Sequence, residues 1–427
     1  MEVRLSTKNM LDIKKIREEK KWVEESLRKK LGSEAELNLD RIISLDDSRK
    51  KIIPKLESLK ADKNKLSKVK PDEETIKKIK DNNLEIKKLE DELNKVEENL
   101  KEYLSALPNI VLEDVLAGGK ENNKVSYTFK DKPKFNFEPK NHVDLAESLD
   151  IIDYKRAAKM SGSGFWIYKG DGALLEWALL NYFITFHIKN NYTFLIPPFL
   201  LNEASAYASG HLPKFGEDLF WLQDNKLCLN ATAEMMLGNY HRDEVLSESD
   251  LPLKYIAYSA CFRREAGSYR QEERGMIRGH QFNKIEMFQY TKPEDSANVF
   301  LEMKKQAQEL LEGLGLHFQI SDLAAGDCSA AMAKTVDIEV YIPSMEVYKE
   351  VSSISNALDY QARRGNIRYK DADGKNYFPH TLNASGMATS RLIPAILEQN
   401  QQADGSVVLP EVLKPFLPAN LTIIKKK

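Results

Sequence analysis

Residues 261–286 of this 427-residue chain read CFRREAGSYRQEERGMIRGHQFNKIE. The stretch has apolar residues near both ends and a long charged middle, a pattern that predicts two strands joined by a long loop. Arg263 and Arg278 stand near the ends of the strands, where they could hold a polyphosphate by charge-assisted hydrogen bonds. A surface hairpin with salt bridges is the alternative interpretation, and it explains only the charges.

The sequence on both sides of this stretch predicts an α+β domain. Aromatic and β-branched runs at 192–198 and 255–258 have the composition of strands, and the stretches near 171–190 and 293–313 have that of helices. Strands and helices in this arrangement suit an antiparallel sheet with helices packed on it.

Residues 40–104 have the composition of a solvated helical arm. They contain 17 Lys or Arg, 16 Asp or Glu and no Gly. Their apolar residues recur in sevens, as in a coiled coil, at Leu45, Ile52, Leu59 and Leu66 and again at Ile79, Ile86, Leu93 and Leu100, with Leu89, Val96 and Tyr103 between them. Pro71 ends one helix and suits the first turn of the next, so we expect an antiparallel helical hairpin. Asn82 is a polar residue on the seam, where it could fix register.

The outer end of this hairpin is basic. Residues 60–80 hold eight Lys against four Asp or Glu. The lysines could simply solvate an exposed helix, or they could contact the phosphates of a polyanion. The sequence leaves both interpretations open.

The Gly, Asn and Lys-rich segment 118–124 predicts a linker between two domains. We therefore expect an N-terminal domain at residues 1–110, which contains the arm at about 40–104, and a second domain at residues 125–427.

Overall composition excludes several classes of protein. The formal net charge of −2 argues against a protein that coats nucleic acid nonspecifically, so an RNA site must be local. Cys228, Cys261 and Cys328 have no zinc-site spacing, and we expect them to be reduced and structural. The first residues have no apolar signal region, and no run of 18 apolar residues occurs. We expect a soluble, intracellular protein without a membrane partner.

Two longer patterns carry a resemblance to a known family. FRxE at 262–265, followed after the loop by RGxxRxHQFxKxE at 274–286, resembles motif 2 of class II aminoacyl-tRNA synthetases, in the form found in seryl-tRNA synthetases. Residues 382–391, LNASGMATSR, with the apolar helix predicted after them, resemble motif 3. The helix predicted at 172–189 and the strand ending at 197–198 resemble motif 1. Shorter segments that resemble this family are Thr232–Glu234, Glu350–Ser353 and Asp359–Arg364.

The resemblance covers nearly the whole chain. It implies a class II antiparallel-sheet catalytic domain with an N-terminal antiparallel coiled-coil arm that binds tRNA. It implies an enzyme of protein biosynthesis that activates L-serine with ATP and Mg²⁺ to seryl-adenylate, then transfers serine to tRNA(Ser) and, where present, to the tRNA for selenocysteine. It further implies a homodimer that associates through motif 1. The compact arm and the lack of a targeting segment predict a cytoplasmic location.

The resemblance also implies roles for single residues. Arg263 would bind the α-phosphate, Glu265 the adenine amino group and Arg278 the γ-phosphate, while Phe282 and Arg391 would cover the two faces of adenine. The residues implied as catalytic are Arg263, Glu350 and Arg391. Those implied for ATP are Arg263, Arg264, Glu265, Arg278, Phe282, Glu350, Val351, Ser352, Ser353 and Arg391. Those implied for serine are Thr232, Ala233, Glu234, Arg263, Glu286, Asn383 and Ser385. The ligands implied for Mg²⁺ are Glu350 and Ser353.

The chain departs from the family pattern in motif 3. Ala384 and Ser390 stand where glycine is usual, and a position that needs positive φ would strain either residue. Arg264 is a lesser departure, at a position where the family often has a small residue.

Other classes of protein explain less of the sequence. A noncatalytic synthetase-like RNA-binding protein is the main alternative, but it would have no use for the ATP residues that this chain keeps. Relatives that charge a carrier protein lack the long arm, and a purely structural coiled coil explains nothing after residue 104.

Overall fold

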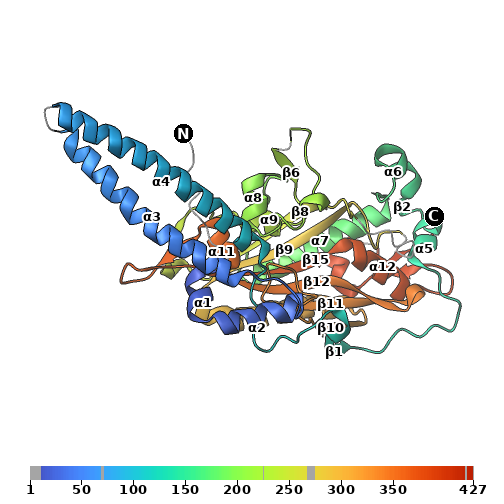
Figure 1. Ribbon diagram of the computed structural model, residues 1–427. Coiled ribbons are helices and arrows are strands. Elements are labelled where there is room, and N and C mark those ends of the chain that lie inside the picture. Colours follow the sequence, from blue (N-terminus) through green and yellow to red (C-terminus); the bar gives the residue numbers. More distant parts are fainter. Residues whose placement is uncertain (1–10, 69–71, 225, 267–274, 419–420, 427) are drawn as a thin grey trace. The chain divides into compact units, whose positions relative to one another are not determined.

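The computed structural model describes residues 11–68, 72–224, 226–266, 275–418 and 421–426 (Figure 1). Pro71, together with the loop residues 267–274 between the two halves of motif 2, lies outside the described residues. The chain divides into two compact units, Met1–Ile110 and Val111–Lys427, and each is treated by itself below.

The first unit contains the predicted arm. Its helices are α1 (Ile13–Glu18), α2 (Lys20–Leu31), α3 (Leu39–Leu66) and α4 (Glu73–Ala106), of which α3 and α4 form a long hairpin (Figure 1). The coiled-coil prediction is confirmed for this pair. The predicted seam residues are all buried or partly buried: Leu45, Ile52, Leu59, Leu66, Ile79, Ile86, Leu89, Leu93, Val96, Leu100 and Tyr103. Leu56 and Leu104 are buried as well. Near the end of α4, Leu104 is fully buried and Tyr103 is only partly buried.

Polar contacts fix both ends of the hairpin. Asp72 is the N-cap of α4, and its side chain accepts a hydrogen bond of 2.7 Å from the backbone N–H of Thr75. At the other end, the Arg17 guanidinium of α1 lies 2.9 Å from a carboxylate oxygen of Asp46 and 2.7 Å from one of Asp47, both on α3. These contacts tie the short helices to the base of the arm.

Only some of the lysines near the tip have acidic partners. Lys60 pairs with Glu90 at 2.6 Å and Lys78 with Glu74 at 2.8 Å. Among the described residues, a second group of tip lysines has no acidic partner within 4 Å: Lys63, Lys68, Lys77 and Lys80. Positive charge therefore remains unneutralised at this end of the arm.

The second unit is built on an eight-stranded sheet in the order β1-β10-β11-β12-β15-β9-β8-β4. In that order the strands are Lys124–Phe129, Phe318–Asp322, Lys334–Ile342, Val347–Leu358, His380–Ala388, Gln281–Thr291, Leu253–Phe262 and Thr193–Leu195. Every neighbouring pair is antiparallel except β4 and β8, which are parallel. The predicted antiparallel α+β fold is confirmed.

Helices and short strands complete this unit. The helices are α5 (His142–Ser148), α6 (Tyr154–Ser161), α7 (Asp171–Lys189), α8 (Glu203–Ala208), α9 (Glu234–Leu237), α10 (Ser296–Leu314), α11 (Tyr360–Gly365) and α12 (Thr389–Gln399). Short 3₁₀ turns lie at Lys120–Asn122, Gly216–Asp218, Glu248–Asp250, Pro293–Asp295, Pro343–Met345 and Glu411–Phe416. The minor strands are β2 (Ile152–Asp153), β3 (Ile167–Tyr168), β5 (Leu200–Asn202), β6 (Leu227–Leu229), β7 (Val245–Ser247), β13 (Arg368–Lys370), β14 (Asn376–Tyr377), β16 (Val407–Val408) and β17 (Ile423–Ile424).

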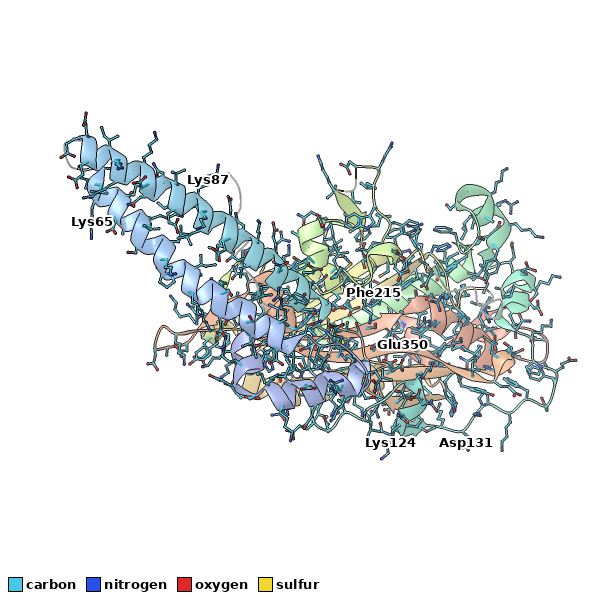
Figure 2. The ribbon with its side chains drawn as sticks, in the orientation of Figure 1. Lys65, Lys87, Lys124, Asp131, Phe215 and Glu350 are labelled. Carbon is cyan, nitrogen blue, oxygen red and sulfur yellow. The ribbon has the colours of Figure 1, made fainter. Side chains whose placement is uncertain are left out.

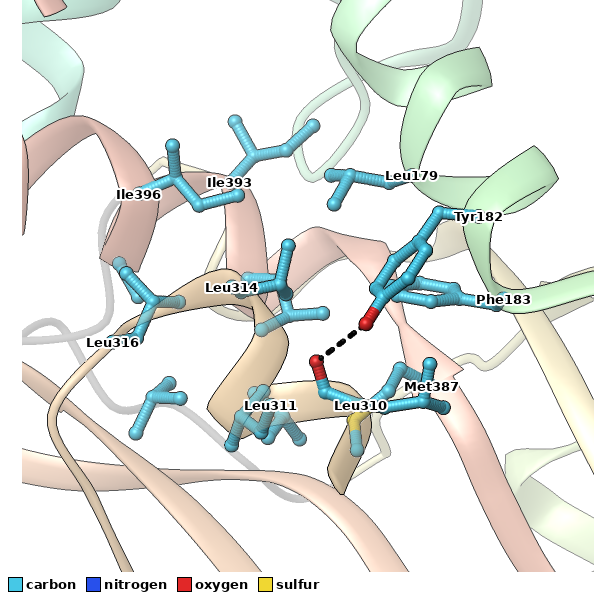
Figure 3. Close-up of a cluster of buried hydrophobic side chains, with 14 of the residues drawn as sticks. Leu179, Tyr182, Phe183, Leu310, Leu311, Leu314, Leu316, Met387, Ile393 and Ile396 are labelled. Atoms are coloured by element: carbon cyan, nitrogen blue, oxygen red, sulfur yellow. Dashed lines mark hydrogen bonds between the residues drawn. The ribbon is translucent and has the colours of Figure 1, made fainter. Parts of the chain in front are cut away.

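The core of the unit lies where three helices meet the sheet. α7, α10 and α12 contribute leucine, isoleucine and aromatic side chains that contact one another and Met387 of β15 (Figure 3). The Tyr182 hydroxyl, at the edge of this cluster, donates to the backbone oxygen of Leu310 at 3.2 Å. This cluster holds the motif 1 and motif 3 helices in place.

The segment proposed as a linker, residues 118–124, lies within the second unit. The backbone N–H of Gly326 donates to the oxygen of Gly118 at 2.8 Å, and that of Ala324 donates to Asn123 Oδ1 at 2.9 Å. Lys124 begins the edge strand β1. Glycines mark this segment because it turns tightly against another loop. Of the helices that the structure describes, none is long and apolar enough to span a bilayer.

Candidate active site

One cavity of the second unit, with a volume of about 410 Å³, collects side chains from segments that are far apart in the sequence. Phe215 and Glu350, both labelled in Figure 2, are among the residues that line it. Most of the residues assigned by resemblance also line it, namely Thr232, Glu234, Arg263, Glu265, Arg278, Phe282, Glu286, Glu350, Val351, Ser353, Asn383, Ser385 and Arg391. A concave site with several charged groups is suited to a charged substrate.

Three of the expected contact residues are not among those lining the cavity: Ala233, Arg264 and Ser352. Ala233 and Ser352 are buried, and Ser352 Oγ donates to the backbone oxygen of Ser385 at 2.5 Å. The backbone N–H of Arg264 donates to the oxygen of Asp218 at 2.9 Å. Direct contact between these three and a substrate stays a prediction.

Strands β8 and β9 place the motif 2 residues. Arg263 directly follows β8, and its backbone N–H donates to the oxygen of His280 at 3.0 Å. Its guanidinium donates to the oxygen of Ala231 at 3.3 Å and lies 5.2 Å from the centre of the Phe282 ring. These contacts hold a cationic group at the wall of the cavity, beside an aromatic face.

Glu265 and Arg278 form an ion pair with one another. Arg278 Nε donates to Glu265 Oε2 at 2.6 Å, and Glu265 has a φ of 52°, in the left-handed region that non-glycine residues seldom adopt. The resemblance assigns these two side chains to opposite ends of ATP.

Arg391 is tied to β12. Its Nη1 donates to the backbone oxygen of Glu350 at 2.8 Å and lies 3.4 Å from Glu350 Oε2, while Nε donates to the oxygen of Ile277 at 3.3 Å. The start of α12 thus brings the motif 3 arginine against the strand that carries the expected magnesium ligands.

A hydrogen-bonded group of four side chains forms the other end of the cavity. Asn383 Nδ2 donates to Glu286 Oε1 at 3.2 Å, and Thr232 Oγ1 lies 3.3 Å from Glu286 Oε2. Lys284 donates to Thr232 Oγ1 at 2.7 Å and forms an ion pair with Glu286. Our assignments from sequence did not include Lys284, although it lies inside the HQFxKxE pattern.

Glu234, buried at the same end, has unusual electrostatics. Burial and the neighbouring Glu286 carboxylate raise the pKa of Glu234 to about 7, while Lys284 and Arg263 act in the opposite direction. Its Oε1 accepts a hydrogen bond of 2.6 Å from Gln361 Nε2. The pocket therefore holds two carboxylates, one of which titrates near neutral pH, and Gln361 is a further residue that the sequence assignments omitted.

His211 also lines the cavity without having been assigned from sequence. Burial lowers the pKa of His211 to about 3, with further contributions from Arg263, Lys284 and Arg364. Its ring is therefore neutral at physiological pH. Nothing in its sequence context marks it, because it belongs to a loop between α8 and β6.

Strands β11 and β12 bring further carboxylates beside the expected magnesium ligands. Asp337 lies opposite Ser353, and Glu339 lies opposite Glu350. Burial and Glu350 raise the pKa of Asp337 well above its usual range, and its buried Oδ1 has no hydrogen-bond partner among the described residues. In the part of the chain that the structure describes, no group of three or more His, Cys, Asp or Glu side chains is placed to hold a metal.

Glu350 and Ser353 nevertheless fit Mg²⁺. This ion keeps several waters and often takes only one or two protein oxygens, because substrate phosphates supply others. The crowding of carboxylates around Glu350 would be relieved by a divalent cation. A two-residue donor set beside excess negative charge thus suits an ion that arrives with a nucleotide.

A buried glutamate joins the three motifs. Glu176 of α7, only 2% exposed, accepts hydrogen bonds of 2.7 Å from Asn283 of β9 and 2.7 Å from the Thr389 hydroxyl at the start of α12. Its Oε2 and the Tyr168 hydroxyl are buried without partners among the described residues. Burial raises the pKa of Glu176 to about 7.

Glu176→Gln should stabilise the protein above about pH 7. Because the pKa is raised from 4.5 to about 7 in the folded state, the ionised carboxylate is disfavoured there, and wild-type stability falls as pH rises through this window. Glutamine keeps an accepting oxygen and removes the charge, a gain on the order of 1–3 kcal/mol. Melting curves of both proteins at low and high pH would measure it, and an identical pH dependence would contradict it.

The motif 3 departures leave the backbone unstrained. Ala384 lies within β15 and pairs with Ile354 and Met287 on the two neighbouring strands, and Ser390 lies in the first turn of α12. Neither is among the described residues with positive φ. Alanine and serine are therefore compatible with the conformation of this motif.

Comparisons with known proteins identify the family of the chain. The family model described as "Seryl-tRNA synthetase N-terminal domain" matches residues 10–111, and that described as "tRNA synthetase class II core domain (G, H, P, S and T)" matches residues 220–400. A serine–tRNA ligase of Clostridium acetobutylicum is 53% identical over 424 residues, which are 96% of this chain and 99% of that protein. The chain belongs to the seryl-tRNA synthetase family. Membership makes it a class II aminoacyl-tRNA synthetase, as the resemblance of motif 2 implied.

Solved structures of the same family resemble the whole chain. A seryl-tRNA synthetase from Pyrococcus horikoshii, complexed with ATP, matches with a TM-score of 0.89 and 33% identity, covering 98% of this chain and 100% of that one. A cytoplasmic serine–tRNA ligase from Naegleria fowleri, in complex with AMP, matches with a TM-score of 0.85 and 30% identity, covering 98% and 99%. None of these matches favours the noncatalytic alternative.

Proposed function

We propose that this chain activates L-serine with ATP and transfers the serine to tRNA(Ser). The observation that carries the proposal is the single cavity in which Arg263, an aromatic face and a carboxylate-rich pocket meet. The first group suits the α-phosphate, the second suits adenine, and the third suits an amino acid with an ammonium and a hydroxyl group.

Adenylate formation needs charge stabilisation more than proton transfer. The serine carboxylate is ionised, so it attacks the α-phosphorus in line without a protein base, and pyrophosphate leaves. Arg263 would neutralise the charge that grows on the α-phosphate and would also hold the attacking carboxylate. Phe282 and Arg391 would fix adenine between them, which keeps the reacting groups aligned.

Serine recognition would fall to the opposite end of the cavity. Glu234 and Glu286 would accept hydrogen bonds from the ammonium group, and Thr232 and Asn383 would pair with the side-chain hydroxyl. Lys284 forms an ion pair with Glu286 and would keep this carboxylate in place within the network. A site that hydrogen-bonds a hydroxyl can reject alanine by about 10⁴ to 10⁵, whereas threonine must be excluded by bulk.

Glu350 and Ser353 would hold Mg²⁺, which would neutralise phosphate charge when bound with ATP. Arg391 contacts Glu350 and would keep this carboxylate oriented. Removal of the metal with EDTA should therefore stop adenylate formation, and full activity without divalent cations would contradict this assignment.

Transfer to tRNA would use both units. We assign tRNA binding to residues 1–110, through the arm, and catalysis to residues 125–427. The unpaired lysines near the tip would contact RNA phosphates. The tRNA for selenocysteine is a second acceptor where it exists, and the cytoplasm is the compartment that we propose, which cell fractionation would test.

A homodimer is the proposed assembly. The motif 1 region carries exposed apolar side chains, among them Leu174 and Trp177 of α7 at 41% and 55% exposure and Ile196 beside β4 at 72%. Exposed apolar side chains suit burial against a second copy. Trp177→Glu should therefore shift the dimer toward monomer in light-scattering measurements, and an unchanged mass at low concentration would contradict this interface.

Charging of unfractionated bacterial tRNA with labelled serine tests the proposed function as a whole. We expect ATP-dependent incorporation that releases label under mild alkali, as an ester does, and none with labelled alanine or threonine at equal concentration. If the protein is folded but neither charges any tRNA nor consumes ATP, the noncatalytic alternative would be favoured.

A further inference from the structure

Gln361 of helix α11 joins two parts of the end of the cavity that we assign to serine. Gln361 is 1% exposed, and its Nε2 donates to Glu234 Oε1 at 2.6 Å and to the backbone oxygen of Ser209 at 3.1 Å. Its Oε1 accepts from the Thr381 hydroxyl at 2.7 Å. Each polar atom of the amide is used, so these contacts admit one orientation of the group.

Arg364, also on α11, holds the segment that runs from the end of α8 into the loop after it, which contains Ser209. Its Nε donates to the backbone oxygen of Tyr207 at 2.6 Å, and its Nη2 donates to that of Leu212 at 2.5 Å. Gly210 of this loop has a φ of 89°, and a Cβ there would lie 2.9 Å from the Cβ of Ala331. Hydrogen bonds from α11 therefore hold this loop on one side, and Ala331 packs closely against it on the other.

We propose that Gln361 is a positioning residue for serine recognition, which fixes the carboxylate of Glu234 and ties it to the loop that carries His211. The proposal rests on the proposed function, because Glu234 acts on serine only if serine binds here. Gln361 itself lies behind the pocket and does not line the cavity.

The residue that donates to Glu234 at this position should be uncharged. Glu234 already faces the carboxylate of Glu286 and the cations Lys284 and Arg263, while His211 lies nearby as a neutral ring and Arg364 comes from α11. A lysine in place of Gln361 would add a charge, and a glutamate would add a third carboxylate. The amide donates to Glu234 and favours its ionised form without changing the net charge of the pocket.

The electrostatic consequence can be measured. Gln361 lowers the pKa of Glu234, acting against burial and Glu286, which together raise it to about 7. Loss of the hydrogen bond should raise this pKa further, so the ionised carboxylate that pairs with the serine ammonium should form only at higher pH. A residue that only stabilised the fold would not shift the pH dependence of serine binding.

The test is serine-dependent exchange of labelled pyrophosphate into ATP by Gln361→Met, a change that keeps side-chain length and removes all three hydrogen bonds. We expect the KM for serine to rise about 10- to 100-fold, since a hydrogen bond to a charged group contributes about 1.5–3 kcal/mol. The KM for ATP should stay within about twofold, because the ATP end of the cavity is untouched. The pH at which the serine KM improves should move upward.

Gln361→Glu keeps the proposal testable if the methionine variant folds poorly. The added carboxylate should repel the carboxylate of Glu234 and raise its pKa, so the pH at which the KM for serine improves should again move upward. Arg363→Gln is the matched control, because Arg363 pairs with Asp359 at 2.7 Å on the same helix and faces Phe378.

The outcomes separate this inference from the proposed function. Absence of serine-dependent exchange in the wild type would defeat the proposed function itself. With an active wild type, an unchanged serine KM in Gln361→Met, or equal rises in the KM for serine and ATP, would overturn the positioning role. An effect of Arg363→Gln as large as that of Gln361→Met would overturn it too.

Discussion

Replacing Arg263 by alanine should lower the rate of serine-dependent pyrophosphate exchange by about 10²- to 10³-fold or more, the cost of losing one preorganised group at a developing charge. The residue lies at the end of β8, where backbone and side-chain hydrogen bonds fix it. The α-phosphate and the serine carboxylate would both lose their main cationic partner. The loss should appear mainly in kcat.

Arg263→Lys is the matched variant for this experiment. Lysine keeps the positive charge but replaces the planar fork by a point charge, so it cannot hold the phosphate and the carboxylate in the same geometry. We expect an intermediate rate. An alanine variant within about threefold of wild type, with the fold intact, would show that Arg263 does not stabilise this step.

Shortening the arm should separate the two steps of the reaction. Lys60 and Glu90 face one another across the hairpin at 2.6 Å, so residues 61–89 can be replaced by a short Gly-Ser turn that joins these two positions. The base of the arm keeps its contacts with Arg17. Pyrophosphate exchange should be unchanged, because no residue that lines the cavity is removed.

Charging of tRNA by the shortened protein should fall by at least about 100-fold, since the loss of even two charge-assisted contacts at about 1.5 kcal/mol each amounts to this factor. Changing Lys63, Lys68, Lys77 and Lys80 to glutamine gives a matched variant with the full arm. It should weaken charging and reduce its salt dependence. Equal loss of exchange and charging in the shortened protein would contradict a separate role for the arm.

The features that could be predicted from sequence are those written in local patterns. Heptads of leucine and isoleucine indicated the hairpin of α3 and α4, because a coiled coil shows its packing as a simple repeat. The motif 2 pattern likewise indicated the two strands β8 and β9, and the apolar run after motif 3 indicated helix α12. In each case neighbouring residues determine the structure.

The features that could not be predicted depend on contacts between distant segments. Lys284 and Gln361 lie within segments that the resemblance singled out, but only folding shows that they contact Thr232 and Glu234. His211 has no local signal at all. The ion pair of Glu265 with Arg278 depends on how the two strands align across a long loop.

The composition of residues 118–124 indicated a linker for a related reason. Glycine and asparagine are typical both of linkers and of tight turns in folded loops. Here the backbone oxygen of Gly118 accepts a hydrogen bond from the backbone N–H of Gly326, a residue far along the chain. The sequence alone cannot distinguish these two uses.

The most direct test of the proposed function is exchange of labelled pyrophosphate into ATP, measured with each of the twenty amino acids, with Mg²⁺ and without tRNA. We predict rapid exchange with serine and at least about 100-fold less with threonine or alanine, because the pocket selects a small side chain that carries a hydroxyl. Exchange with no amino acid, or equal exchange with several, would contradict the assignment of this cavity to serine activation.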